Sequence, residues 1–190
     1  NTCMKNHVLA IALLLACGLA VPLATAADGT ITLTGEITGT TCTISGGTGG
    51  VAGSGANFPV VLDKVQASAL STEGATASAK PFFIYVGGGA SCADATKVAV
   101  LYESTSPAIN PATGNLRNMP PKTAAAKVEV QILDGATRKP MDLRTGHASS
   151  TATVTGGLAT LPFAARYIAT GGAAGAGLVT TAVQYSVISP

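Results

Sequence analysis

The chain has 190 residues, which suits one domain with a substantial core. Only 11% of the residues are charged, 47% are hydrophobic, and the basic residues behind the net charge of +2 are scattered. A nucleic-acid binder needs a clustered basic face, so that class is excluded. With 4% aromatic residues and no tryptophan, the composition suits a β-rich protein that packs against copies of itself.

The chain is expected to begin with a leader, residues 1–26, whose signal peptide starts at Met4 and is removed on export. Lys5 supplies the positive charge, residues 8–23 supply the apolar stretch, and Ala-Thr-Ala ends the leader as a small-residue cleavage site. A glycine and a proline interrupt the apolar stretch, which disfavours a transmembrane helix. A lipoprotein box before Cys17 is an alternative, but the residues after it stay apolar instead of forming a polar tether.

The first strand is predicted immediately after the cleavage site, over residues 28–38. Apolar residues and glycines alternate there with threonine and glutamate, and only a strand has a period of two. The apolar face consists of Gly29, Ile31, Leu33, Gly35 and Ile37. Its glycines leave room for another backbone to come close. A freed N-terminus is normally polar and frayed, so this face needs a partner.

Short strands separated by turns are predicted along the rest of the chain, with no convincing amphipathic helix. The segment 97–103 is apolar on both faces, as in a strand buried between layers, whereas 127–134 alternates like a half-exposed strand. The segment 64–80 can hold a short helical turn, and 104–122 is expected to be a loop. The other predicted strands are 58–62, 81–86, 151–155, 161–169 and 178–188. This pattern indicates a β-sandwich.

Gly-rich segments at 45–55 and 87–89 lack the Gly-Lys-Ser/Thr ending of a phosphate-binding loop, so they are interpreted as connections and no cofactor is expected. After export Cys42 and Cys92 remain, which form either one disulfide or two buried free thiols. A metal site is disfavoured because His147 is the one histidine left and nothing near it has ligand spacing.

An enzyme is also disfavoured by the sequence. A hydrolase needs a base beside a nucleophile, and His147 lies with Ser149 and Ser150 in a Gly/Ser/Thr-rich segment typical of a surface loop. The carboxylates are dispersed and show no paired spacing suited to acid–base catalysis. No catalytic residue is therefore assigned.

The chain resembles the major-type subunits of chaperone–usher fimbriae, and its pattern is most similar to that of the type 1 main subunit. The resemblance spans residues 27–190 and ends in a terminal strand with Val183, Tyr185 and Val187. Such subunits usually have an aromatic penultimate residue, whereas Ser189 stands there in this chain, a departure that concerns chaperone docking. The matching motifs are GTITLTGEITGTTCTI, VLDKVQASALSTEGATASAKPFFI, SCADATKVAVLYE and LPFAARYIATG.

The resemblance implies an incomplete immunoglobulin-like sandwich that lacks its last strand and has one disulfide, Cys42–Cys92. Residues 27–38 are then a donor strand, residues 39–190 are the pilin domain, and Gly177 matches a family glycine. A periplasmic chaperone fills the groove along the terminal strand first. At an outer-membrane usher, the donor strand of the next subunit replaces the chaperone, which is a known form of β-strand addition.

A head-to-tail contact of this kind builds an open filament. The expected function is therefore a structural subunit of the rod of an adhesive surface fimbria, exported through the periplasm. The alternative is a minor, adaptor or receptor-binding subunit, for which the sequence indicates no host receptor. A two-domain tip adhesin is disfavoured because the exported chain enters the pilin pattern directly. An isolated subunit is expected to be poorly stable, because its terminal strand has an unpaired edge over an open core.

Overall fold

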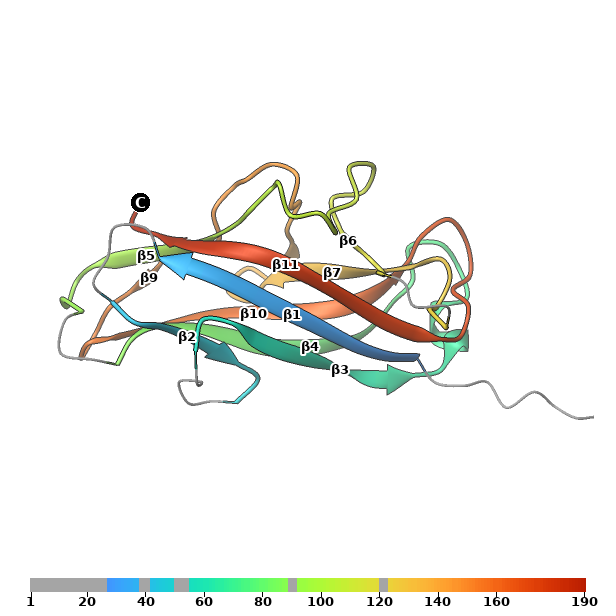
Figure 1. Cartoon of the computed structure of the whole chain (residues 1–190), viewed down its shortest axis with the longest axis horizontal. Helices are drawn as coiled ribbons and strands as arrows, with labels where there is room; N and C mark the ends of the chain where they lie inside the picture. The colour runs from blue at the N-terminus through green and yellow to red at the C-terminus, as the bar shows by residue number, and fades with distance from the viewer. Residues whose placement is uncertain (1–26, 38–41, 50–54, 89–91, 120–122) are drawn as a thin grey trace, which may run out of the picture.

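Two β-sheets packed face to face form the protein in a computed structural model that describes residues 27–37, 42–49, 55–88, 92–119 and 123–190 (Figure 1). The expected leader and its cleavage site lie outside the described residues. The first sheet has the strand order β3-β1-β11-β5-β9. Its strands are β1 (Ala27–Ile37), β3 (Phe58–Val65), β5 (Lys97–Tyr102), β9 (Ala152–Thr153) and β11 (Leu178–Ile188).

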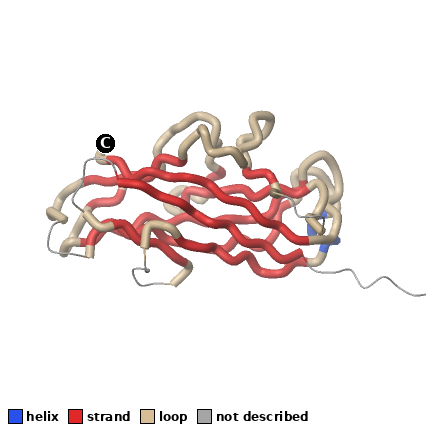
Figure 2. The backbone as a smooth tube through the Cα atoms, viewed as in Figure 1, coloured by secondary structure: helices blue, strands red, loops and turns tan. Residues whose placement is uncertain are grey.

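The second sheet has the order β2-β4-β10-β7-β6, and a short strand β8 pairs with β7. Its strands are β2 (Ile44–Gly47), β4 (Thr76–Gly87), β6 (Leu116–Arg117), β7 (Val128–Asp134), β8 (Lys139–Pro140) and β10 (Leu158–Ala169). The helical turn anticipated within 64–80 is the 3-10 turn η1 (Ala67–Leu70), which lies at one end of the sandwich (Figure 2). No helix among the described residues is long and apolar enough to cross a membrane.

The core lies between the sheets because β10 and β11 turn every second side chain inward. Phe163 of β10 stacks on Phe82 of β4 with ring centroids 5.5 Å apart, and it meets the edge of Tyr102 of β5 at the same distance. These aromatic contacts join the two sheets, and all three rings are almost completely buried. The fold is therefore the expected all-β sandwich.

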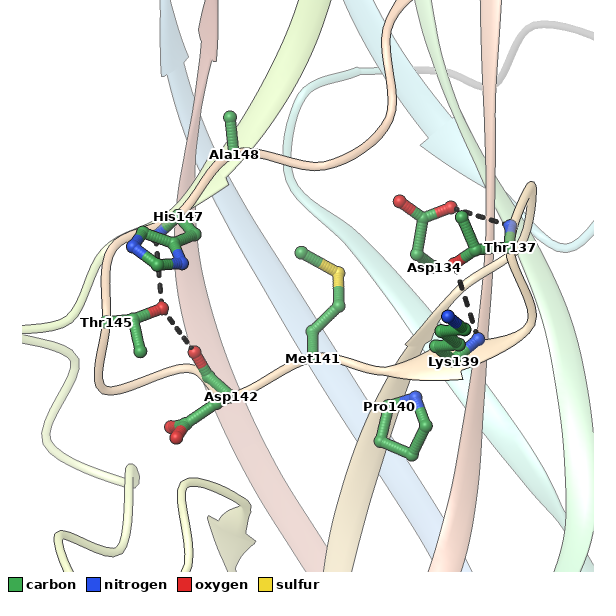
Figure 3. Close-up of a pocket in the computed structure, with 9 residues that line it drawn as sticks. All are labelled: Asp134, Thr137, Lys139, Pro140, Met141, Asp142, Thr145, His147 and Ala148. Atoms are coloured by element: carbon green, nitrogen blue, oxygen red, sulfur yellow. Dashed lines mark hydrogen bonds between the residues drawn. The ribbon is translucent and has the colours of Figure 1, made fainter.

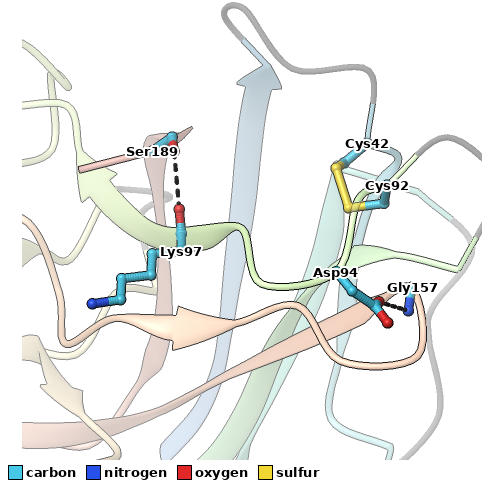
Figure 4. The surroundings of a disulfide bond; sticks show 6 residues. All are labelled: Cys42, Cys92, Asp94, Lys97, Gly157 and Ser189. Carbon is cyan, nitrogen blue, oxygen red and sulfur yellow. Dashed lines mark hydrogen bonds between the residues drawn. A yellow bond between two sulfur atoms is a disulfide. The ribbon is translucent and has the colours of Figure 1, made fainter.

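The disulfide between Cys42 and Cys92 is confirmed, and the alternative of two free thiols is wrong (Figure 4). Cys42 precedes β2 and Cys92 precedes β5, so the bond, with a Cα–Cα distance of 4.7 Å, links the second sheet to the first. The enclosed loop carries β2, β3 and β4 and so contributes to both sheets.

Nearby, the Ser189 hydroxyl donates a hydrogen bond to the carbonyl of Lys97 at 3.1 Å, which holds the end of the chain beside β5.

The strand β7 differs from its predicted half-exposed pattern, because all seven of its residues are buried. Its outward carboxylate, Glu129, accepts hydrogen bonds from the side chains of Asn110 and Thr113, which belong to the segment expected to be a loop. Gln131 accepts hydrogen bonds from the Arg166 guanidinium at 2.7 and 2.9 Å. The face of β7 that carries Glu129 and Gln131, which the alternation predicted to be exposed, is thus covered by polar side chains from distant segments.

Candidate functional site

The N-terminal strand β1 lies inside the first sheet, between β3 and β11 (Figure 1). It runs parallel to β11, from Asp28 opposite Leu178 to Ile37 opposite Val187, and antiparallel to β3. The strand β11 therefore has β1 on one side and β5 on the other. The isolated chain was expected to leave this edge of β11 open; in the structure the chain's own β1 covers it.

The apolar face of β1 points into the core as its alternation predicts. Ile31 and Leu33 have no exposed surface, whereas Thr32 and Thr34 are exposed. The backbone of Ile37 pairs with Val187. Opposite β1, the strand β11 turns five side chains inward, all of them buried: Val179, Thr181, Val183, Tyr185 and Val187.

Two glycines of β1 each lie against a tyrosine. A Cβ atom on Gly29 would lie 2.6 Å from the Tyr167 hydroxyl oxygen, and a Cβ atom on Gly35 would fall within the ring of Tyr185. Real Cβ atoms do not approach other heavy atoms so closely, so alanine does not fit at either position unless a buried ring moves. Gly29 and Gly35 are thus the two positions at which β1 needs to lack a side chain in order to fit the groove, the space between β3 and β11.

Hydrogen bonds fix both tyrosines in place, one to the backbone of β3 and one to the backbone just before it. The Tyr185 hydroxyl donates to the carbonyl of Ala56 at 2.6 Å, and the Tyr167 hydroxyl donates to the carbonyl of Asp63 at 3.1 Å. Burial raises the pKa of Tyr185, so its hydroxyl remains a proton donor. Tyr185 also meets Phe58 edge-on with centroids 6.2 Å apart. These contacts give the groove a fixed shape.

The end of the groove near Ile37 is polar. The last residue of β1 that pairs with β3 is Leu33, and beyond it the amide of Gly35 donates to the side-chain oxygen of Asn57 at 3.1 Å. The side chain of Asn57 thus accepts the hydrogen bond that a longer β3 backbone would otherwise accept. A pocket of about 430 Å³ opens there, lined by Thr34, Gly35, Asn57, Glu103, Thr105, Gln184, Tyr185 and Ser186.

Gly177 precedes β11 in a conformation with φ +151°. A Cβ atom there would lie 2.5 Å from the amide nitrogen of Ala125. That segment pairs with the start of β11, because Ala125 donates to the carbonyl of Leu178 at 2.8 Å and Leu178 donates to the carbonyl of Thr123 at 2.9 Å. The glycine therefore allows a neighbouring segment to fix where β11 begins.

A second pocket, of about 250 Å³, lies between the β7–β8 turn and the loop that carries His147 (Figure 3). His147 is exposed, and its backbone amide donates to the Thr145 hydroxyl at 3.2 Å. The nearby Ser149 hydroxyl donates to the carbonyl of Ser150 and accepts a hydrogen bond from the amide of Val100. The Ser149 hydroxyl is thus engaged in hydrogen bonds with the backbone. Within the described residues, no three His, Cys, Asp or Glu side chains gather to hold a metal ion.

Sequence reasoning identified the strand that fills the groove and three residues of β11, but it missed Tyr167 and Asn57. Tyr167 lies at an inward position of β10, and the alternation of that strand could have placed it in the core. No local signal links it to Gly29, which is distant in the sequence. Asn57 precedes a predicted strand and has no recognisable motif.

The fold is thus a two-sheet sandwich whose first sheet holds an N-terminal strand between β3 and β11. No protein-family model matches the chain. It is similar to the major fimbrial subunit SMF-1 of Stenotrophomonas maltophilia, with 39% identity over 89% of this chain and 97% of that protein. It is also 35% identical to the type-1 fimbrial protein A chain of Escherichia coli, over 90% of this chain and 91% of that one. The chain belongs to the family of type 1 fimbrial subunits.

A solved structure agrees with this assignment at the level of the fold. The crystal structure of the P pilus rod subunit PapA superposes with a TM-score of 0.54, and the match covers 78% of this chain and 99% of that one. Its sequence identity is 14%, so this likeness shows the fold alone.

Proposed function

We propose that the chain is a structural subunit of a fimbrial rod and that it polymerises by exchange of β1. Residues 27–38 are the donor strand, and residues 39–190 are the domain that provides the groove. The observation that carries the proposal is the position of β1, the first described strand, which lies between β3 and β11 and pairs with both. A strand so placed can be supplied equally by another subunit, which generates a head-to-tail filament.

Export requires that the groove be covered before assembly. Without β1, the backbone edge of β11 and the side chains beneath Ile31 and Leu33 would meet water. Burial of these two side chains contributes roughly 3–6 kcal/mol before the entropy cost of ordering the strand is subtracted. The free energy of unfolding of a typical domain is only about 5–15 kcal/mol, so this contribution is a large part of it. A periplasmic chaperone that lends a strand, followed by an outer-membrane usher where the next subunit replaces it, meets this need.

The proposed role is structural and involves no catalysis. The relatives with significant identity are named as fimbrial subunits, and Ser149 is held by backbone hydrogen bonds. The exposed His147 needs no further role than that of a loop residue.

Deletion of residues 27–38 tests the polymerisation function. The shortened subunit keeps its groove but has no strand to donate, so surface filaments should be lost while the unaltered subunit forms them. Immunogold labelling of normal filaments then separates the rod from the alternative of a minor subunit. Label along the whole shaft supports the rod, and label confined to the tip would assign the chain as an adaptor.

A further inference from the structure

The outer face of the second sheet carries a pocket of about 410 Å³ with a largely apolar lining. Its floor lies over β4 and β10, where Phe83 is directly opposite Pro162 and Pro81 is directly opposite Ala164. Leu133 of β7 continues the second of these rows. Pro81 is exposed, and Phe83 and Pro162 are half-buried, so the pocket presents a ring-lined apolar surface to solvent.

Two guanidinium groups line the same pocket. Arg166 of β10 donates through Nε and Nη2 to the side-chain oxygen of Gln131, and its Nη1 makes no hydrogen bond to the described residues. The side chain of Arg138 is exposed and has neither a hydrogen bond nor an ion pair within the described part of the chain. The pocket therefore offers positive charge and unused hydrogen-bond donors.

The carboxylate that lines the pocket does not neutralise these cations. The oxygens of Asp134 accept hydrogen bonds from the backbone amides of Ala136, Thr137 and Ser150 at 2.9, 3.3 and 2.7 Å. The backbone carbonyl of Asp134 accepts a further bond from the amide of Arg138 at 2.7 Å. Asp134 thus shapes the β7–β8 turn that presents Arg138, and the guanidinium of Arg138 stays available to an anion.

The backbone beneath the pocket is closed to a peptide strand. β10 pairs with β4 on one side and with β7 on the other, and β4 pairs with β2 as far as Phe83. Addition of a strand requires an unpaired backbone edge, and the ring of Pro81 has no N–H to offer. The pocket volume lies within the range of about 300–1,000 Å³ that is typical of small-ligand sites. Its lining is also smaller than the about 20–30 residues that each partner contributes to a standard protein interface.

We propose that this pocket binds an acidic sugar residue of a polysaccharide, that is, a pyranose ring that carries one carboxylate. The apolar C–H face of such a ring packs on Phe83 and Pro162, since the face of an aromatic ring is negative and attracts C–H groups. The carboxylate accepts the paired N–H donors of Arg138, and Arg166 adds a second cation. Uronic acids and sialic acids share this chemistry. This binding activity goes beyond the proposed structural role and does not require a filament.

The test measures how the exported subunit, as a monomer, binds defined oligosaccharides. The two acidic probes are hyaluronan oligosaccharides, which carry a uronic acid, and oligosialic acid. Each is compared with its carboxyl methyl ester, which keeps the ring and removes the charge. Backbone NMR signals recorded during the titration locate the site. The signals of Phe83 and Arg138 should shift with at least one acidic probe, and the probe that binds identifies the class of sugar.

Four variants test the pocket, two of them as a matched pair. Arg138→Gln should weaken binding about tenfold or more, because it removes a hydrogen bond to a charged group. Lys139→Gln removes the same charge at the next exposed position, which does not line this pocket, and should change the affinity less than about twofold. Arg138→Lys keeps the charge without the planar fork and should fall between them. Phe83→Ala should weaken binding by removing the apolar floor.

The proposal would be overturned if neither acidic probe shifted the signals around the pocket, or if the methyl esters bound as tightly as the free acids. Equal losses in Arg138→Gln and Lys139→Gln would reduce the binding to unspecific charge attraction and overturn it as well. Filaments sheared from producing cells should bind the same polysaccharide. Binding by monomers alone would show that neighbouring copies cover this face, which would overturn its role on the fibre. A failure to form filaments would contradict the proposed function and leave the monomer measurement unaffected.

Discussion

Removal of β1 should turn a stable subunit into a marginal one. Ile31 and Leu33 are completely buried in the structure, and their burial is worth roughly 3–6 kcal/mol. The ladder that β1 makes with β3 and β11 is lost at the same time. Since 1 kcal/mol corresponds to a shift of about 2–4 °C for a protein of this size, a chain lacking residues 27–38 should melt roughly 10–20 °C below the chain of residues 27–190.

Restoration of the strand at the other end of the chain should restore stability. A copy of Asp28–Thr38, appended after Pro190 through a short flexible linker, begins beside the C-terminal end of β11 and runs back along it. The resulting protein should be a monomer that does not polymerise and that melts far above the deleted chain. The Leu33→Ala variant of the intact chain should lower the melting temperature by an intermediate amount. Thr32→Ala, on the exposed face, serves as its matched control.

Thermal unfolding followed by circular dichroism, with light scattering to record the oligomeric state, measures all of these variants. The reasoning would be refuted if the deleted chain were monomeric and melted within a few degrees of the intact chain. The sandwich would then be complete without β1, and the groove would have no need of a donor.

Three further predictions follow from single residues. Gly35→Leu should reduce filament yield sharply because its side chain would collide with Tyr185, whereas Thr34→Ala should not; normal yield from the leucine variant would show that the ring moves aside. Cys42→Ser should remove ~4 kcal/mol of stability on the loop-entropy account and lower the amount of subunit at the surface; two free thiols in the unfolded exported protein, found by thiol labelling, would contradict this. Burial raises the pKa of Asp134, but hydrogen bonds from three backbone amides outweigh it and leave the pKa below its ordinary value. The ionised Asp134 carboxylate should therefore stabilise the fold fully above its unfolded-state pKa of about 3.9, and this contribution should be lost as the pH falls through the lower pKa of the folded state. An acid-unfolding curve that is unchanged in Asp134→Asn would contradict this prediction.

The elements that the sequence predicts well are those whose signal is local. The alternation from Gly29 to Gly35 indicates both the strand and its buried face. Successive side chains of a strand point to opposite faces, so this pattern can be recognised without knowing which strand pairs with it. The disulfide was predicted from the two cysteines that lie outside the expected leader and from the family resemblance. Turn residues likewise separate most of the strands.

The features that could not be predicted depend on contacts between distant segments. Parallel pairing of β1 with β11 joins the two ends of the chain, and nothing in either strand specifies that direction. The buried outward face of β7 depends on Asn110 and Thr113 from another segment, so the alternation around Glu129 wrongly suggested exposure. Tyr167 completes the groove from the opposite sheet, a relation that emerges only when the sheets are packed.

The position of the disulfide determines how a filament of such subunits carries a pulling force. In the proposed filament, tension would enter each subunit through the residues that lead from β1 to Cys42 and would leave through the strand paired with β11. The bond to Cys92 leads from that root directly towards β5, the neighbour of β11 in the first sheet. The covalent segment that carries β2, β3 and β4 is therefore bypassed and cannot be drawn out while the bond is intact. If subunits exchange strands as proposed, the fibre could be stretched without each subunit being unravelled from its N-terminal strand.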